Sequence, residues 1–416
     1  MSSESRSSTD VVVVGGGIAG SALATVLARN GLEVVVLERD VTYRDKVRGE
    51  ALTCWGVVEL RRLKLEQPLL DAGGGYVTRS VLYDEVCDPA EAEASPVELG
   101  ELLPDVPGCL TVGHPEACQG LSQAAALAGA TVIAGVRDIE VSAGTSPAVR
   151  YTREGISYRV ACRLVVGADG RLSTVRSQSG ITLQQTSPRT MGGGMLVEGL
   201  HAWPRDRISL GTEADLHYLI FPRANGTVRL YLLHDIAQKG RFTGSTRQND
   251  FLKAYQFRCI PDSGMFAGAR PAGPCAFYPM NDSWTSQPYA PGAVLIGDAA
   301  GWNDPIIGQG LSIALRDARI VSDIVQSTDD WSPASFAGYG EERRERMRRL
   351  RVAAQVTTDI RATFGPLAAA RRRAYNAAIP NDLVLAGPVL AGELGPEQLP
   401  AASFEQHNID RILALG

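Results

Sequence analysis

The sequence predicts an α/β protein in which a parallel-sheet domain is interrupted by an inserted antiparallel sheet and followed by C-terminal helices. A buried strand runs into a glycine-rich turn and a helix over residues 11–31, and a second strand–loop–helix pattern fills residues 293–325. Between them, apolar and polar residues alternate around Asn225-Gly226, which is a strong hairpin signal. The predicted divisions are residues 1–186 and 276–355 for the parallel-sheet domain, 187–275 for the inserted sheet and 356–416 for the helices.

Composition excludes several classes of protein. With 416 residues and 44% hydrophobic content the chain can build a sizeable core, and its net charge of −5 lacks the basic excess typical of nucleic-acid binding. No apolar stretch approaches the roughly 18 residues of a membrane span, and the polar start MSSESRSSTD is unlike a signal peptide. The seven cysteines never occur as CxxC, so no metal site is expected. We expect a cytoplasmic enzyme with no nucleic-acid partner and no stable membrane association.

The N-terminal segment is a complete βαβ unit. The β-branched run Val11–Val14 is followed by Gly15-x-Gly17-x-x-Gly20, a helix, and a second strand predicted from Leu32 to Leu37, just before Glu38. Gly15 permits the tight turn, Gly17 admits a pyrophosphate and Gly20 allows close packing, while the acid can accept ribose hydroxyls. This Rossmann-like pattern predicts dinucleotide binding. The predicted cofactor contacts of the unit are Gly15, Gly17, Ile18, Ala19, Gly20, Glu38 and Arg39.

Two further motifs follow in chain order. In CRLVVGADGRLSTVR a strand ends at Gly167-Ala168-Asp169-Gly170 before a short helix opens, and Asp169 is a candidate cofactor contact. In GDAAGWNDPIIGQG, residues 297–310, one carboxylate, four glycines and a proline lie between a buried strand and an apolar helical pattern. A loop in that place exposes backbone N–H groups to a ligand.

Together the three motifs, which span Gly15 to Gly310, resemble the flavoprotein aromatic hydroxylases, the single-component (group A) FAD monooxygenases of the p-hydroxybenzoate hydroxylase fold. The resemblance implies FAD as cofactor, NADPH or NADH as reductant, and O₂ as co-substrate. It also implies oxygenation of an aromatic or conjugated small molecule, in most cases hydroxylation, through a flavin C4a-hydroperoxide. Because no second glycine fingerprint is evident, the reductant would bind transiently; delivery of electrons by a separate reductase is the alternative.

The resemblance also assigns residues. The carboxylate at Asp298 would be ionised and buried against the flavin ribityl chain, while Pro305, Gly308 and Gly310 would lie along the isoalloxazine. Arg48, in the segment VRGE, would border the flavin and its reductant. Arg48, Pro305 and Gly308 are therefore the candidate catalytic residues. Further candidate FAD contacts in these segments are Arg48 itself, Gly297, Gln309 and Leu311.

The inserted sheet is expected to cover the flavin face where oxygen transfer occurs. Alternation alone does not show which face of a strand points inward. The candidate substrate contacts are His217, Tyr218, Phe221, Tyr231 and Trp302, with His234 a further candidate to line the sheet.

Two departures from the family pattern leave other functions open. The loop reads GDAAG where many relatives have GDAAH, and GDAAG also occurs in geranylgeranyl-reductase-like enzymes and flavin-dependent halogenases. His114 stands where relatives often carry an arginine. A double-bond reductase therefore stays an alternative; a halogenase is disfavoured because the WxWxIP signature is absent, and a non-catalytic FAD module because the inserted sheet suggests a substrate pocket.

Two charged segments are interpreted as structural rather than functional. The loop-rich acidic insertion near residues 80–108 is expected to be a solvated connection. The arginine-rich run from Arg343 to Arg351 predicts a solvated amphipathic helix that packs by one edge. The last fifty or so residues would close the FAD domain or form an oligomer contact, in a monomer or homodimer.

Overall fold

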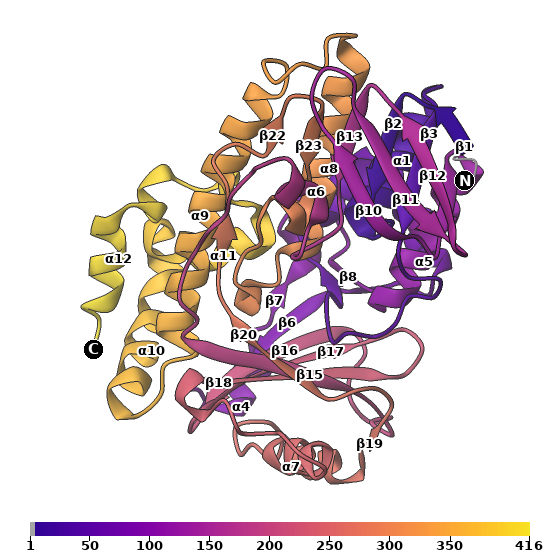
Figure 1. The fold of residues 1–416 in the computed structure, drawn as a ribbon. Helices are drawn as coiled ribbons and strands as arrows, with labels where there is room; N and C mark the ends of the chain where they lie inside the picture. The colour runs from indigo at the N-terminus through magenta and orange to yellow at the C-terminus, as the bar shows by residue number, and fades with distance from the viewer. Residues whose placement is uncertain (1–4) are drawn as a thin grey trace.

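The computed structural model describes residues 5–416 and has a parallel sheet at its centre (Figure 1). The six strands have the order β22-β23-β13-β2-β3-β9, and all neighbours run parallel except β22 and β23. The strands are β2 (Val11–Val14), β3 (Val34–Glu38), β9 (Thr131–Ala134), β13 (Leu164–Gly167), β22 (Tyr289–Ala290) and β23 (Ala293–Leu295).

The valines of β2 explain how this sheet is covered on both faces. Val11 and Val13 pack in one core with three helices, and Val12 and Val14 pack in another with a four-stranded sheet of order β1-β12-β11-β10. All four are essentially inaccessible, as a strand buried on both sides requires. The helices are α1 (Ile18–Arg29), α5 (His114–Leu127) and α8 (Gly310–Ser327); the strands are β1 (Ser5–Ser8), β10 (Arg137–Ser142), β11 (Ala148–Arg153) and β12 (Ile156–Ala161).

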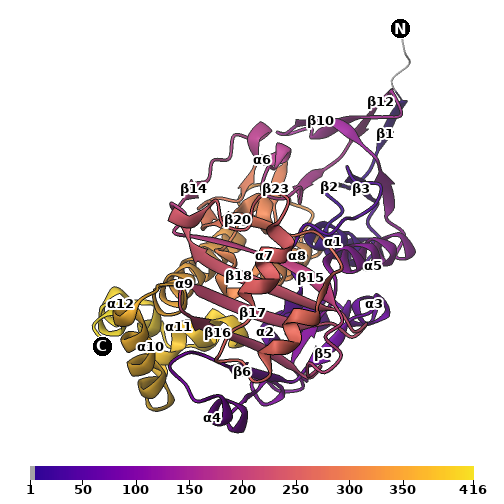
Figure 2. The same cartoon turned by 90° about the horizontal axis from the view of Figure 1, so that it is seen from below.

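The inserted sheet lies below the parallel-sheet domain in Figure 1, and its predicted hairpin is confirmed. The order is β19-β15-β18-β17-β16-β6-β7, with β20 on β15, so strands from outside residues 187–275 join it. Helix α7 (Arg247–Ala254) covers its far face (Figure 2). The strands are β6 (Arg79–Leu82), β7 (Val97–Glu98), β15 (Thr190–Glu198), β16 (Arg207–Glu213), β17 (Leu216–Pro222), β18 (Val228–Asp235), β19 (Arg270–Pro271) and β20 (Ala276–Met280).

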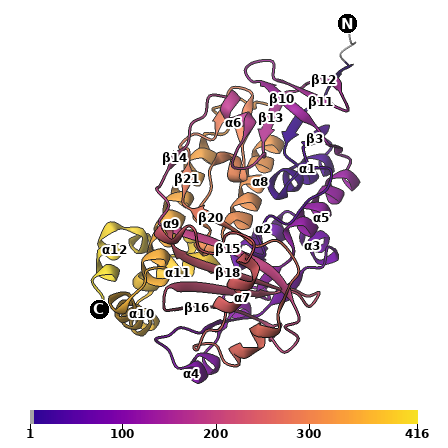
Figure 3. The same ribbon diagram turned by 60° about the horizontal axis from the view of Figure 1, so that its bottom comes forward.

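Helices at the C-terminus flank both sheets (Figure 3). They are α9 (Ala337–Arg361), α10 (Pro366–Ala378), α11 (Leu383–Leu394) and α12 (Gln406–Leu413). The mixed α/β architecture with a helical C-terminal part is thus confirmed. Helix α9 runs through the predicted boundary at residue 355, and that division remains a prediction. Among residues 5–416, no helix combines the length and apolar character that a membrane crossing needs.

Smaller elements complete the connections. The short strands are β4 (Ala51–Leu52), β5 (Gly75–Val77), β8 (Cys109–Thr111), β14 (Gln184–Gln185) and β21 (Ser283–Trp284), and the short helices are α2 (Cys54–Arg62), α3 (Glu66–Asp71), α4 (Pro89–Ala94) and α6 (Thr174–Gln178). The acidic insertion is less solvated than expected. Asp84 is fully buried, where Arg372 donates to it at 3.2 Å and Arg361 lies 3.7 Å away. That carboxylate anchors the insertion to the C-terminal helices.

Candidate functional site

The glycine-rich turn between β2 and α1 needs two of its glycines for its own shape. Gly15 has φ of +104°, and a Cβ there would lie 2.4 Å from the Ala168 carbonyl oxygen. A Cβ on Gly20 would lie 2.0 Å from the Gly15 carbonyl oxygen, whereas a Cβ on Gly17 would meet no atom within 4 Å. Gly17 is therefore the glycine at which another group can approach the backbone.

Backbone donors at the two helix starts fit an anionic cofactor. Ile18 and Ala19 open α1, whose N-terminus carries no side-chain cap, and α8 begins after Gln309, also without one. A Cβ on Gly297 would lie 3.2 Å from the Ala19 Cβ, so the loop before α8 meets the start of α1. Free N–H groups at a helix start favour phosphate and other anions.

Glu38 ends β3 beside this turn. Its Oε2 accepts a hydrogen bond from the Gly16 N–H at 2.6 Å and its Oε1 accepts one from the Asp40 N–H at 2.7 Å. Each oxygen keeps a further lone pair for a ribose hydroxyl. The Arg39 side chain is largely exposed, and its Nε lies 3.4 Å from Asp40 Oδ1.

Asp169 uses both carboxylate oxygens within its own segment. Ser173 donates its hydroxyl to one oxygen at 2.5 Å, and the N–H of Thr174 donates to the other at 2.7 Å. These bonds secure the start of α6. Arg176 of α6 then donates to the Ala299 carbonyl at 3.0 Å, which fastens the second motif to the third. The assignment of Asp169 to the cofactor remains a prediction beside this structural role.

The Asp298 carboxylate faces a partly exposed arginine. Arg171 Nε lies 3.4 Å from Asp298 Oδ2, and both side chains are 31% exposed. The same guanidinium stacks over the Trp302 ring at 5.1 Å. In the protein alone this carboxylate is therefore half-buried rather than buried as expected. Trp302 belongs to this group of residues, and its Nε1 donates to Asn281 Oδ1 at 3.4 Å, directly after β20 of the inserted sheet.

Behind the loop, Arg343 of α9 forms what we call the arginine clamp. Its guanidinium donates to the carbonyls of Gly297, Ala300 and Gly301 at 3.2, 2.8 and 2.9 Å, and to Asp317 Oδ2 at 2.9 Å. Arg343 is 1% exposed and Asp317 is inaccessible. Although burial alone would raise the pKa of Asp317, the neighbouring guanidiniums hold it below its usual value.

Arg346, one turn further along α9, donates to Asp317 Oδ1 at 2.6 Å and is also buried. The prediction of a solvated arginine helix is therefore wrong for Arg343 and Arg346. Arg344, by contrast, is exposed. Asp317 lies within the apolar pattern of α8, and a buried carboxylate needs a buried cation as its partner. That acid was the signal in the sequence for the arginine clamp.

The end of the loop leaves two glycines uncovered. Gly308 adopts φ of +66°, and a Cβ on Gly308 or on Gly310 would meet no atom within 4 Å. The Gln309 side chain instead forms hydrogen bonds within the protein. It accepts one from Trp55 Nε1 at 2.7 Å and donates one to the Gly392 carbonyl at 3.1 Å. Only its backbone remains for a cofactor. Pro305 opens the short turn whose isoleucines face the inserted sheet.

The VRGE segment lies against the starts of α5 and α8. A Cβ on Gly49 would lie 3.1 Å from the His114 ring and 3.3 Å from the Leu311 side chain. Burial, reinforced by the Arg48 charge, lowers the pKa of His114 to about 4. His114 is therefore neutral at pH 7. Arg48 itself is exposed, so its guanidinium is accessible to a ligand.

Side-chain alternation shows which face of the inserted sheet points inward. Leu219 and Leu233 pack with Ile306 and Ile307 of the flavin-assigned loop. Phe221 packs against the parallel-sheet core and lies edge-on to Tyr231, with ring centroids 5.9 Å apart. We call Leu219, Phe221, Tyr231 and Leu233 the sheet wall. It joins the two halves of the site.

Three predicted substrate residues do not lie in the sheet wall. Tyr218 is inaccessible and stacks on Phe257 at 4.6 Å in the core on the opposite face. His234 also faces that side, edge-on to Phe242. His217 is buried against the C-terminal helices, and burial with the Arg361 charge lowers its pKa to about 3. Tyr218 and His234 thus point away from the sheet wall, whereas His217 lies on the same face as Leu219 and Phe221, beside Thr212. The substrate role of each of the three remains a prediction.

A charged group that the sequence did not reveal ties the VRGE segment to the sheet. Glu50 is buried, accepts from Arg223 Nε at 2.7 Å and lies 3.0 Å from Arg229 Nη2. Arg229 is inaccessible and donates a second bond to Asp45 at 2.6 Å. We call Asp45, Glu50, Arg223 and Arg229 the charged quartet. Its ion pairs join the VRGE segment to the strands of the sheet wall.

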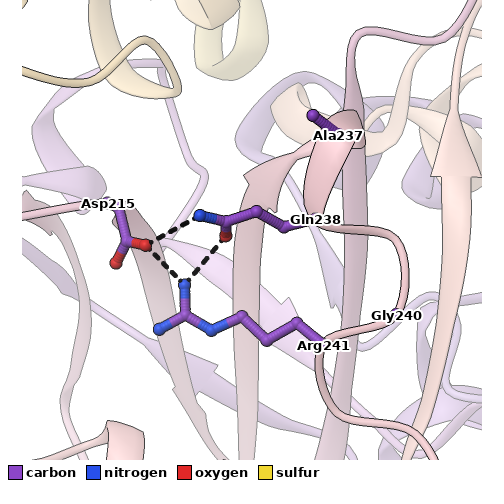
Figure 4. Close-up of a pocket in the computed structure, with 5 residues that line it drawn as sticks. All are labelled: Asp215, Ala237, Gln238, Gly240 and Arg241. Carbon is purple, nitrogen blue, oxygen red and sulfur yellow. Dashed lines mark hydrogen bonds and ion pairs between the residues drawn. The ribbon is translucent and has the colours of Figure 1, made fainter.

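Two other features lie apart from these segments. A surface hollow is lined by Asp215, Gln238 and Arg241, whose side chains bond one another at 2.7–3.1 Å (Figure 4). Those polar groups are already satisfied. Cys54, Cys109 and Glu393 bring three ligand-type atoms within 4.8 Å of one another, and the Cys109 thiol donates to the carboxylate at 3.2 Å. A thiol–carboxylate hydrogen bond accounts for that cluster, and the absence of a metal remains a prediction.

Residues from all three motifs therefore converge on one place and fit a flavin dinucleotide. A Cβ on Gly17, Gly308 or Gly310 would meet no protein atom within 4 Å, and the α1 and α8 starts supply free donors. The sheet wall lies against the loop before α8 and borders the same place from the inserted sheet. Contacts made by FAD itself remain predictions for each residue.

Comparisons with known proteins agree with this geometry. The profile of a family described as "FAD binding domain" matches residues 8–354. Squalene monooxygenase SE1 of Panax ginseng is 28% identical over 333 residues, which are 79% of this chain and 60% of that protein. The chain thus spans about 60% of the length of that relative. A menaquinone reductase of Mycolicibacterium smegmatis is 28% identical over 347 residues, 78% of each chain.

Solved structures show the same fold. A p-nitrophenol 4-monooxygenase from Pseudomonas putida superposes with a TM-score of 0.77 at 17% identity, covering 98% of this chain and 99% of that one. The flavin-dependent brominase Bmp2 gives a TM-score of 0.75 at 17% identity, covering 97% and 99%. At such identities the likeness concerns the fold alone.

Proposed function

Because the chain belongs to the FAD binding domain family, we propose that it is an FAD-dependent monooxygenase that uses NADPH or NADH and O₂ to oxygenate an aromatic or conjugated small molecule. Membership confirms the resemblance drawn from the three motifs. The observation that carries the proposal is the sheet wall: Leu219 and Leu233 lie against Ile306 and Ile307 of the loop assigned to the isoalloxazine. A substrate enclosed there would lie beside that ring.

The protein's own residues bind, orient and exclude water. The Gly17 and Gly310 backbones would hold the two ends of the cofactor, and Asp298 would anchor its ribityl chain. When bound, FAD supplies the redox chemistry with NAD(P)H and O₂. The apolar side chains of the sheet wall would keep water from the reacting atoms, and Arg48, exposed beside the flavin-assigned loops, would receive the reductant.

A double-bond or quinone reductase is the second candidate. The menaquinone reductase matches 78% of its own length, whereas the squalene monooxygenase matches 60%, and the loop carries GDAAG. The halogenase alternative rests on fold likeness to the brominase only. We further propose a cytoplasmic monomer or homodimer.

Isotope labelling separates the two candidates. Purified FAD-loaded protein is incubated with NADPH or NADH under ¹⁸O₂ and a panel of phenols, quinones and polyenes, with reduced-cofactor consumption and product mass recorded. One ¹⁸O atom in the product of a coupled turnover is expected. Reduced product without label would replace the monooxygenase with the reductase.

Anaerobic mixing tests the electron source. Bleaching of the flavin by NADPH or NADH in the presence of a substrate is expected for a single-component enzyme. Unchanged flavin absorbance with every substrate would require a separate reductase.

A further inference from the structure

Two buried thiols lie side by side where α2 and β8 begin. Cys54 is the first residue of α2 and Cys109 the first of β8, and both are inaccessible to solvent. Their sulfur atoms lie within 4.8 Å of each other and of a Glu393 carboxylate oxygen. Strand β4 pairs antiparallel with β8, with Leu52 opposite Leu110, so the two cysteines follow that pair by two residues and one residue. Neighbouring segments at this level are placed so that a disulfide can join them.

The residues beside this pair hold the loop before α8. Trp55, which follows Cys54, donates to Gln309 Oε1 at 2.7 Å. The carbonyl of Gly392, which precedes Glu393, accepts from Gln309 Nε2 at 3.1 Å. A shift of Cys54 or of Glu393 is therefore one residue away from a hydrogen bond that supports the loop.

In the reduced state each thiol has an acceptor. Cys109 Sγ donates to Glu393 Oε2 at 3.2 Å, and Cys54 Sγ donates to the Leu99 carbonyl at 3.6 Å. The hydrogen bond to Cys54, burial and the Glu393 carboxylate raise the pKa of Cys109, so this thiol keeps its proton at pH 7. Cys54 is then the sulfur that attacks an oxidant. Glu393 is only partly buried, so the pair lies one side chain below the surface.

We propose that Cys54 and Cys109 form a modification site, a dithiol that hydrogen peroxide oxidises to a disulfide, and that closing this bond loosens the loop before α8. The dithiol is independent of the proposed function, whereas its effect on the flavin rests on the assignment of that loop to the isoalloxazine. The oxidant has to be as small as a peroxide because both sulfurs are buried.

The oxidation proceeds in two balanced steps. The Cys54 sulfur attacks one peroxide oxygen, the O–O bond breaks, and the departing hydroxide takes the Cys54 proton and leaves as water. The Cys109 sulfur then attacks the sulfenic acid on Cys54, and its proton passes through Glu393 to the departing oxygen, which leaves as a second water. Two electrons pass from the sulfurs to the peroxide, and one S–S bond replaces two S–H bonds. Glu393 thereby loses its thiol donor.

Thiol counting tests the site. FAD-loaded full-length protein is treated with hydrogen peroxide, catalase removes the excess, and free thiols are counted after denaturation, with peptide mass mapping of any cross-link. The parent should lose two of its seven free thiols, form a cross-link between Cys54 and Cys109, and recover both thiols with dithiothreitol. Cys54→Ala should form no cross-link. Cys109→Ser, which keeps a donor toward Glu393, is a second variant that should form none.

The matched control is Cys275→Ala, which removes a buried thiol just before β20 and should still lose two thiols. The FAD Kd is measured by fluorescence before and after oxidation. It should rise roughly 3- to 10-fold in the parent and in Cys275→Ala, because the loop loses about one supporting hydrogen bond. It should stay within about twofold in Cys54→Ala, where no disulfide can close.

Three results would overturn the site: retention of every thiol in the parent, a cross-link between other cysteines, or a zinc ion in the purified protein that protects both thiols. A disulfide between Cys54 and Cys109 with an unchanged FAD Kd would overturn its coupling to the loop. The thiol count needs neither substrate nor turnover, so a failure of the monooxygenase in the labelling experiment would leave it unaltered.

Discussion

Replacing Arg343 by lysine tests whether the arginine clamp supports the flavin loop. Lysine keeps the positive charge for Asp317, but it is a point donor and cannot span three carbonyls and a carboxylate as a planar guanidinium does. If roughly two of the carbonyls lose their donor while buried, at about 1–2 kcal/mol each, the folded state loses about 2–4 kcal/mol. In a chain of 416 residues such a loss would lower Tm by roughly 2–5 °C.

The assay compares Arg343→Lys with Arg344→Lys, one residue along the same helix. Arg344 is exposed, so its substitution should leave Tm within about 1 °C of the parent. Thermal unfolding is followed with and without added FAD, and the FAD Kd is measured by fluorescence. We expect Arg343→Lys to show both a lower Tm and weaker FAD binding. Equal Tm values for the two variants would refute the reasoning, because the clamp would then contribute nothing measurable.

Three further predictions concern the cofactor and the pH response. Gly17→Val should give a folded protein without yellow colour, because the side chain would fill the one approach to the turn; stoichiometric FAD after purification would contradict it. Asp298→Ala should weaken FAD binding roughly 10- to 100-fold in a fluorescence titration, with the exposed Asp329→Ala as control, and equal Kd values would reject the ribityl assignment. Because the folded pKa of His114, about 4, lies below its usual 6.5, the stability that the neutral ring contributes is complete above pH 6.5 and is lost as the pH falls toward 4. The Tm of His114→Gln should therefore fall less than that of the parent between pH 7 and pH 4.5; parallel curves would show that His114 does not titrate in this way.

Local sequence patterns were enough to predict those elements whose signal lies within one short stretch of the sequence. Val11–Val14, the glycine spacing and Asn225-Gly226 each specify a strand, a turn or a hairpin within a few residues, and the structure has all three. The convergence of the motifs could be inferred because the carboxyl ends of parallel strands share one edge of a sheet.

Pairings between distant residues could not be predicted in the same way. The arginine helix looked amphipathic and solvated because its partner carbonyls lie more than 40 residues away. Tyr218 and Tyr231 are equally aromatic and equally alternating, and only the register of β17 on β18 separates the core face from the sheet wall. The charged quartet joins residues about 180 positions apart, so no local pattern revealed it.

The bond from Gln309 to the Gly392 carbonyl sets an order for synthesis. The first βαβ unit is translated by residue 38, but its central strand β2 also pairs with β13, about 150 residues later. The loop assigned to the isoalloxazine gains its last support 83 residues after it has been translated. Both halves of the cofactor site therefore depend on contacts made late in the chain, and full loading would wait for nearly the whole polypeptide.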